Sequence, residues 1–125
     1  MKKIVSFLFG ALMLIGFTAC EKGLEVNDAN LTGSWEMTKI TSGNQEAPGG
    51  GQIWEFTANH ELYVYQAGSE KDYAGEWNLD GKQLTTPFFP FPATVTELTE
   101  NALVLELREP QSGMVASKYE FEKVK

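Results

Sequence analysis

The sequence predicts an all-β domain, an eight-stranded antiparallel up-and-down barrel over residues 31–125. Three observations predict this fold. Apolar and polar residues alternate with a period of two in eight short segments, the pattern of strands with one buried face. Segments rich in turn-forming residues separate these strands. No segment between residues 31 and 125 shows the 3.6-residue period of an amphipathic helix. A sheet of eight strands hides its edges most completely by closing on itself.

The expected strands follow one another with short connections. They are Gly33 to Ile40, Gln52 to Ala58, the segment around Leu62 to Tyr65, Asp72 to Leu79, Lys82 to Thr86, Ala93 to Leu98, the segment around Leu103 to Leu107, and Val115 to Val124. The connection Thr41 to Gly51 ends in three consecutive glycines and is expected to be mobile. Asp80-Gly81 is a strong hairpin signal, because both residues tolerate the positive φ of a type I′ turn.

The alternation also predicts which side chains point into the barrel. These are Trp35, Met37, Trp54, Phe56, Leu62, Val64, Tyr73, Trp77, Leu79, Leu84, Val95, Leu103, Leu105, Leu107, Tyr119 and Phe121. A barrel of eight strands is either filled by its side chains or holds one small ligand. Because so many of these side chains are large, we expect any cavity to be modest.

The N-terminus has the anatomy of an export signal. Lys2 and Lys3 precede the apolar run Ile4 to Phe17, and small residues follow it, so residues 1–19 are expected to be a signal peptide. The apolar run is shorter than the roughly 20 residues of a transmembrane helix. Removing Lys2 and Lys3 changes the formal charge from −7 to −9. This acidity argues against binding to nucleic acid or to anionic lipid, both of which need clustered basic residues.

Phe17-Thr18-Ala19-Cys20 resembles the lipobox of bacterial lipoproteins. The resemblance implies lipidation of the Cys20 sulfur and anchoring to a membrane, and a secretory signal with a chance cysteine is the alternative. The next residue is Glu21 instead of the aspartate associated with inner-membrane retention, which favours the outer membrane. The sequence does not distinguish the periplasmic face of that membrane from the outer face. Residues 20–30 are polar and lack periodicity, so we expect a flexible tether.

The predicted barrel contains four further motifs: Leu31-Thr32-Gly33-Ser34-Trp35, the pair Trp54 and Phe56, Gly75-Glu76-Trp77 before the Asp80-Gly81 hairpin, and Tyr119-Glu120-Phe121. Together these motifs resemble the lipocalin-like domains of small bacterial lipoproteins. In lipocalins the tryptophan of a G-x-W motif plugs one end of the barrel beneath a basic residue of the last strand. The resemblance therefore implies that Trp35 is this plug and that Lys123 covers it through a cation–π contact.

We find no constellation of residues that predicts catalysis, a metal site or a cofactor. His60 is the only histidine and stands in an expected turn without neighbours at ligand spacing, so a surface turn residue is the favoured interpretation. No serine or cysteine has a histidine partner that would make it a nucleophile. The sequence therefore predicts a noncatalytic protein.

The segment Thr86 to Pro92 places three phenylalanines among three prolines and is expected to be a loop at a barrel rim. Its rings either contact a hydrophobic ligand, a partner protein or the bilayer, or cap the barrel end. The candidate ligand contacts are Phe88, Phe89, Phe91, Trp54, Trp77 and Tyr73. Two hypotheses follow: a binding module for a small hydrophobic or amphipathic molecule, or a filled barrel that interacts with another envelope protein.

Overall fold

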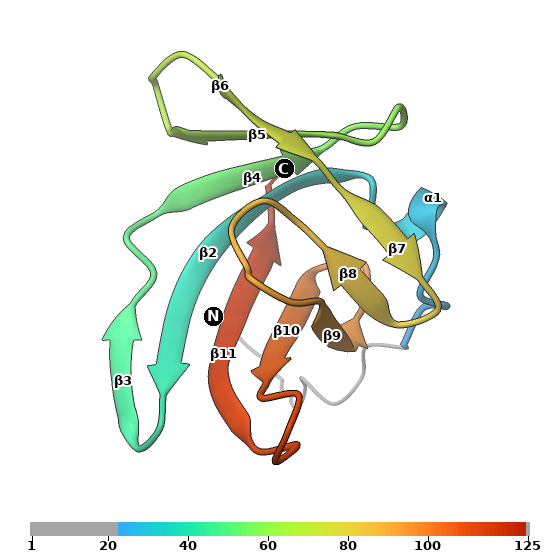
Figure 1. The fold of residues 1–125 in the computed structure, drawn as a ribbon. Coiled ribbons are helices and arrows are strands. Elements are labelled where there is room, and N and C mark those ends of the chain that lie inside the picture. Colours follow the sequence, from blue (N-terminus) through green and yellow to red (C-terminus); the bar gives the residue numbers. More distant parts are fainter. Residues whose placement is uncertain (1–22, 125) are drawn as a thin grey trace, which may run out of the picture.

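The computed structural model describes residues 23–124 as one short helix and a ten-stranded antiparallel sheet that curls into a nearly closed barrel (Figure 1). The elements are α1 (Asp28–Leu31), β2 (Gly33–Ser42), β3 (Gln45–Pro48), β4 (Gln52–Phe56), β5 (Glu61–Gln66), β6 (Asp72–Glu76), β7 (Asn78–Asp80), β8 (Gln83–Thr85), β9 (Ala93–Leu98), β10 (Ala102–Arg108) and β11 (Val115–Lys123). The predicted signal peptide and Cys20 lie outside the described residues.

The strands pair in the order β6-β5-β4-β2-β11-β10-β9-β8-β7. The first strand of the barrel, β2, thus pairs with the last strand, β11, in the register Met37↔Phe121. The two ends of the path, β6 and β7, are consecutive in the chain and separated by Trp77 alone. Chain continuity therefore connects the two ends of the path. The predicted antiparallel barrel is confirmed as a nearly closed barrel, with nine strands in its path in place of the predicted eight.

One expected strand, Asp72 to Leu79, is divided in two. β6 pairs with β5 and β7 pairs with β8, and the break falls at the buried Trp77. The Trp77 N–H donates to the carbonyl of His60, which extends the β5–β6 pairing by one residue before the chain turns toward β8. The division lets one continuous segment serve two neighbours, which is what closes the barrel.

The prediction of a mobile connection from Thr41 to Gly51 is wrong for most of this segment. β2 extends to Ser42, and β3 pairs back onto it from Ser42↔Gln45 to Lys39↔Pro48. Gly43 has a φ of 62°, so it adopts the left-handed conformation that this tight turn needs. The extra strand lies outside the barrel path, and its four residues are exposed.

Tyr73 was expected to point inward, and it is instead 56% exposed. The β5–β6 register changes from Leu62↔Gly75 to Tyr63↔Tyr73, so β6 contains one extra residue at this bulge. A bulge changes the parity of the residues beyond it. Tyr73 consequently packs edge-on against Tyr63, with the ring centroids 5.5 Å apart.

The interior is filled largely by the predicted inward residues. The buried core cluster consists of Leu31, Trp35, Met37, Trp54, Phe56, Leu62, Trp77, Leu84, Ala93, Val95, Leu98, Leu103, Leu105, Leu107 and Phe121. Three more of the expected residues, Val64, Leu79 and Tyr119, are partly buried against this cluster.

The folded part begins before residue 31. The Leu24 N–H donates to the Leu98 carbonyl at 2.7 Å, and Leu24 and Val26 pack against the core. Asn27 then caps α1 by accepting a hydrogen bond from the Asn30 N–H at 2.9 Å. The predicted tether through Asn30 is therefore too long, because its apolar residues have a place on the barrel.

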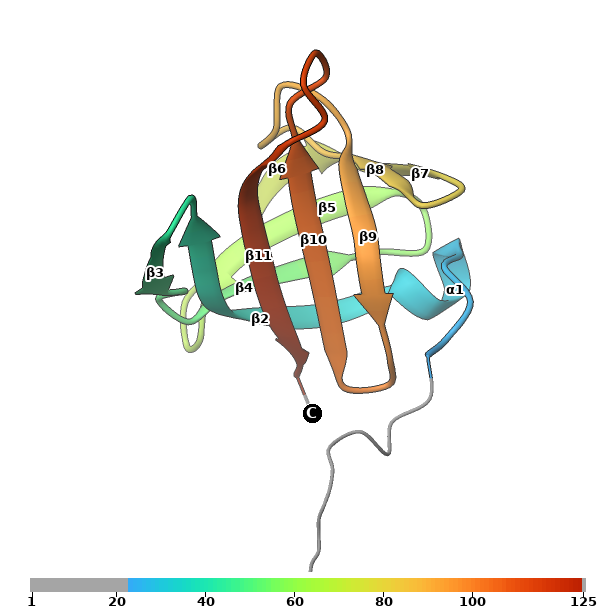
Figure 2. The same cartoon turned by 90° about the horizontal axis from the view of Figure 1, so that it is seen from below.

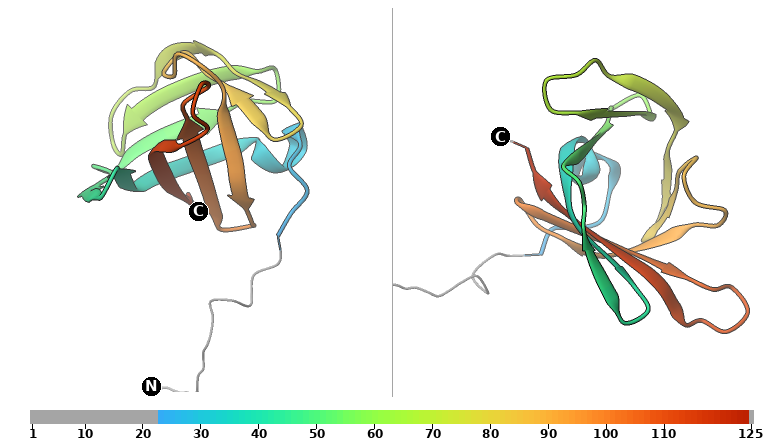
Figure 3. Two further views of the ribbon diagram at one scale, coloured as in Figure 1. Left: turned by 60° about the horizontal axis from the view of Figure 1, so that its bottom comes forward. Right: turned by 90° about the vertical axis from the view of Figure 1, so that its left-hand side faces the viewer.

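The two ends of the barrel are built differently (Figure 2). One end, called the closed end here, has α1, the β9–β10 turn and the C-terminal end of β11. The other end, called the mouth, has the β8–β9 loop and the β10–β11 turn. The right-hand view of Figure 3 shows the β2–β3 and β10–β11 hairpins projecting side by side beyond the barrel body.

Candidate functional site

The candidate site is an aromatic cluster at the mouth, centred on the buried Trp54 of β4. The Phe88 ring stacks on Trp54 with a centroid distance of 4.9 Å and an interplanar angle of 29°. The rings of Phe89 and Phe121 lie 5.9 Å and 5.1 Å from it in tilted arrangements. The structure thus brings residues of the β8–β9 loop onto the inward face of two strands distant in sequence.

Prolines and one buried hydroxyl position the β8–β9 loop. The Phe88 N–H donates to Thr86 Oγ1 at 3.2 Å, and the Phe89 N–H donates to the Thr86 carbonyl at 3.5 Å. Pro87 packs closely on Gly75 of β6, where a Cβ atom would lie 2.7 Å from the proline Cγ. A glycine is needed there both for this contact and for its φ of 144°.

The three phenylalanines of the loop are not equally covered. Phe89 and Phe91 are partly buried against the core, and Phe89 also lies 5.2 Å from the Tyr119 ring. Phe88 is 45% exposed even though one of its faces covers Trp54. Phe89 and Phe91 therefore cap the barrel, while Phe88 presents apolar surface to the outside.

A polar group lies beside this cluster. The Trp54 Nε1–H donates to Gln52 Oε1 at 2.9 Å, which leaves an amide group at the edge of an aromatic surface. Such an arrangement suits an apolar or amphipathic molecule that presents one polar group. Gln52 was not among the predicted site residues, although its position two residues before Trp54 assigns it to the inward face.

Two predicted ligand contacts are not at the mouth. Tyr73 is on the outer surface, as described above. Trp77 belongs to the closed end, where its Nε1–H donates to the Thr57 carbonyl at 3.2 Å. Its ring contacts Phe56 edge-on at 5.5 Å and His60 at 4.5 Å. Trp77 is therefore a core residue of the end opposite the loop.

The predicted plug pair is brought together at the closed end. Lys123 Nζ lies 4.5 Å from the centroid of the buried Trp35 ring and donates to the Thr32 carbonyl at 3.3 Å. The Trp35 Nε1–H donates to the Leu31 carbonyl at 2.9 Å. Partial burial lowers the pKa of Lys123 below its usual 10.5, because the ammonium group loses hydration.

His60 lies in the β4–β5 turn with a left-handed φ of 68°. Its Nε2 is 2.7 Å from Asp28 Oδ2, so it connects the turn to α1. Within residues 23–124 no cluster of three or more His, Cys, Asp or Glu side chains is arranged to hold a metal ion. The same stretch contains no helix long and apolar enough to cross a membrane.

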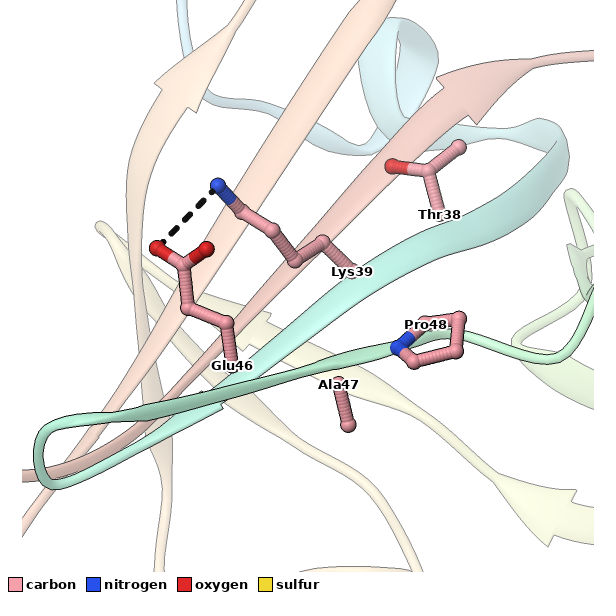
Figure 4. A pocket seen from close by; sticks show the side chains of 5 residues that line it. All are labelled: Thr38, Lys39, Glu46, Ala47 and Pro48. Atoms are coloured by element: carbon pink, nitrogen blue, oxygen red, sulfur yellow. Dashed lines mark ion pairs between the residues drawn. The ribbon is translucent and has the colours of Figure 1, made fainter.

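A hollow of about 280 Å³ lies on the outside of the barrel, along the β2–β3 hairpin (Figure 4). Its lining consists of Thr38, Lys39, Glu46, Ala47 and Pro48. Lys39 Nζ is 3.4 Å from Glu120 and 3.5 Å from Glu46, and these carboxylates, Glu120 most strongly, raise the pKa of Lys39. The charge in this shallow hollow is thus already paired, which makes the mouth the better candidate site.

An antiparallel barrel with one plugged end and one loop-covered mouth defines an up-and-down β-barrel of the class that can hold a small ligand. The family model of the lipocalin-like domain matches residues 31–105, more than half of the chain. The chain belongs to this family of lipocalin-like domains. No curated protein and no solved structure gives a significant match to it.

Proposed function

We propose that this protein is a lipid-anchored lipoprotein of the cell envelope that binds a small apolar or amphipathic molecule, without catalysis, at the mouth of its barrel. The observation that carries the proposal is the stacking of Phe88, a half-exposed residue of the proline-rich β8–β9 loop, on the buried Trp54. A ligand would slide under or replace this loop and lie against Trp54, with its polar group toward Gln52.

The energetics of the loop support this opening. Two hydrogen bonds to Thr86 hold its backbone, and its other contacts described above are the packing of Pro87 on Gly75 and the packing of the aromatic rings. Each aromatic pair contributes about 0.5–1.5 kcal/mol beyond its burial. Burial of apolar surface by a ligand stabilises the complex by about 25 cal/mol for each Å². An apolar molecule can therefore offset the lost ring contacts by making equivalent ones.

A matched pair of exposed aromatic residues tests the site. The purified protein is titrated with the apolar dye ANS, and Phe88→Ser is compared with Tyr73→Ser, which changes a ring of similar exposure on the outer face. We expect Phe88→Ser to change the dye affinity about 2- to 10-fold, the equivalent of one aromatic contact, and Tyr73→Ser to leave it unchanged. Equal effects of the two variants would contradict a site at the mouth.

The anchoring rests on the sequence Phe17-Thr18-Ala19-Cys20, and the outer membrane is the proposed location. Intact-mass measurement of the protein from membranes tests it. We expect the wild-type protein to begin at Cys20 and to carry acyl chains. The Cys20→Ser variant should carry no acyl chains. An unmodified Cys20 in the wild-type protein would contradict the anchoring and leave the ligand site untouched.

The second candidate function is an envelope protein that acts through its surface. The observation that favours it is the filling of the interior by the fifteen side chains of the core cluster. Native mass spectrometry of protein purified from its host separates the two candidates. A retained small molecule supports the ligand-binding proposal, whereas an empty protein that also fails to bind ANS supports the surface role.

A further inference from the structure

The N-terminal segment of the described chain is fastened to the closed end of the barrel. Leu24 is held there by its hydrogen bond to Leu98, which ends β9. Val26 packs on the core, and α1 follows, joined to the β4–β5 turn by the contact between Asp28 and His60. The first fixed point of the domain is thus Leu24, at the end opposite the aromatic loop.

The distance from this point to the proposed lipid is short. Leu24 follows Cys20 by four residues, and successive Cα atoms are about 3.8 Å apart, so their Cα atoms are at most about 15 Å apart. β11 runs nine residues between the closed end and the mouth, or about 30 Å at the usual rise of a strand. The connection is therefore too short to let the barrel turn over and bring its mouth to the bilayer.

We infer that the closed end of the barrel faces the bilayer that holds the anchor, and that the mouth opens away from it into the aqueous compartment. This inference rests on the proposed lipidation of Cys20. It assigns the closed end, with the exposed Glu25, Asp28 and Glu100, to the zone of the lipid headgroups. Charged side chains are compatible with that zone and not with the acyl chains.

The orientation limits how a ligand reaches the site. Three exposed apolar side chains, Phe88, Met114 and Val115, are 45%, 69% and 42% exposed and belong to the mouth. In this orientation they cannot dip into the anchoring bilayer. The ligand consequently enters from the aqueous side, as a dissolved molecule or from a carrier, and is not drawn from the lipid beneath the protein.

Fluorescence quenching tests the orientation on the full chain made in a bacterial host. Two variants, Glu100→Cys in the β9–β10 turn and Gln111→Cys in the β10–β11 turn, each place one thiol-reactive dye on an exposed residue. A lipidated Cys20 has a thioether sulfur and does not react. Each labelled protein is reconstituted into phosphatidylcholine vesicles containing a lipid with a nitroxide on its headgroup.

The expected result is clear quenching of the dye at position 100 and little quenching at position 111, because nitroxide quenching acts only at short range. Stronger or equal quenching at position 111 in protein with the acyl mass would overturn the orientation while leaving the anchoring intact. If the acyl mass is missing, the anchoring fails and the orientation fails with it. A Cys20→Ser version of each labelled protein is the control, and its dye should not be quenched.

Discussion

Aromatic side chains cover both the closed end and the mouth of the barrel, but different interactions hold these side chains in place. At the closed end the indole N–H groups of Trp35 and Trp77 donate to backbone carbonyls, and Lys123 covers the Trp35 ring. At the mouth Phe88 and Phe89 have no polar atoms in their side chains and simply lie on Trp54. Hydrogen bonds fix a ring in one position, whereas ring packing accepts any apolar surface of similar shape.

Because the two ends are held differently, we expect only the mouth to open. Breaking the closed end leaves buried donors and acceptors unpaired, at about 1–3 kcal/mol for each group. Opening the mouth exposes rings but breaks few hydrogen bonds, and a ligand replaces the lost contacts.

Replacing Trp35 by alanine should have the largest effect. The side chain is fully buried, so Trp35→Ala is expected to lower the free energy of unfolding by about 3–5 kcal/mol. The matched variant at the mouth, Phe88→Ala, should cost less than about 1.5 kcal/mol, the value of one aromatic pair. Urea unfolding followed by circular dichroism measures both, and similar losses would mean that the ends do not differ.

A methyl group at Gly75 should disturb the packing of Pro87, and with it the position of the β8–β9 loop. Both Gly75 and Gly81 have positive φ values, of 144° and 61°, but only at Gly75 does an added Cβ meet Pro87. We therefore expect Gly75→Ala to cost about 1–3 kcal/mol more than Gly81→Ala, the usual range for overpacking. Thermal unfolding of the two variants checks this, and equal midpoints would show that Pro87 does not rest on Gly75.

The loop itself contains an internal comparison. Phe89 is partly buried against the core and Tyr119, whereas Phe88 is half exposed. Phe89→Ser should cost about 1.5–3 kcal/mol, the value of burying a phenylalanine, and Phe88→Ser clearly less. If all three phenylalanines are replaced by serine and the midpoint of thermal unfolding stays unchanged, the loop is not a cap.

Lys123 should give the smallest effect, visible in the pH dependence of stability. Its pKa is lowered in the folded protein, so between that value and 10.5 the unfolded chain binds more protons. Stability contributed by this group therefore rises with pH across this window. The free energy of unfolding of the wild type minus that of Lys123→Met, measured from pH 8 to 10.5, should increase. A falling difference would show that the ammonium group is stabilised where it lies.

The sequence was sufficient for the architecture, because period-two alternation is a direct consequence of strand geometry. Seven of the eight expected strands are present as single strands and the eighth is divided into β6 and β7. The contact of Trp35 with Lys123 follows from the strand pairing between β2 and β11. β3 was missed because its segment, Gln45–Pro48, is only four residues long, is exposed throughout and shows no alternation of apolar and polar residues. The inward assignment of Tyr73 failed because a bulge depends on the partner strand, which one strand's sequence does not record.

The candidate site was predictable only in part. The composition of residues 86–92 pointed to the loop, and alternation placed Trp54 inside. The position of Trp77 at the closed end depends on the division of β6 from β7. The packing of Pro87 on Gly75 joins the β8–β9 loop to a separate strand. Such contacts arise from closure of the barrel and have no local signal.

Hydrogen exchange tests most directly the claim that the mouth opens and the closed end does not. Exchange is followed by mass spectrometry in peptides covering residues 86–93 and residues 31–37, with and without ANS. We expect fast exchange in residues 86–93 that slows when the dye binds, and slow exchange in residues 31–37 under both conditions. Slow exchange at 86–93, or dye-dependent protection only at 31–37, would contradict it.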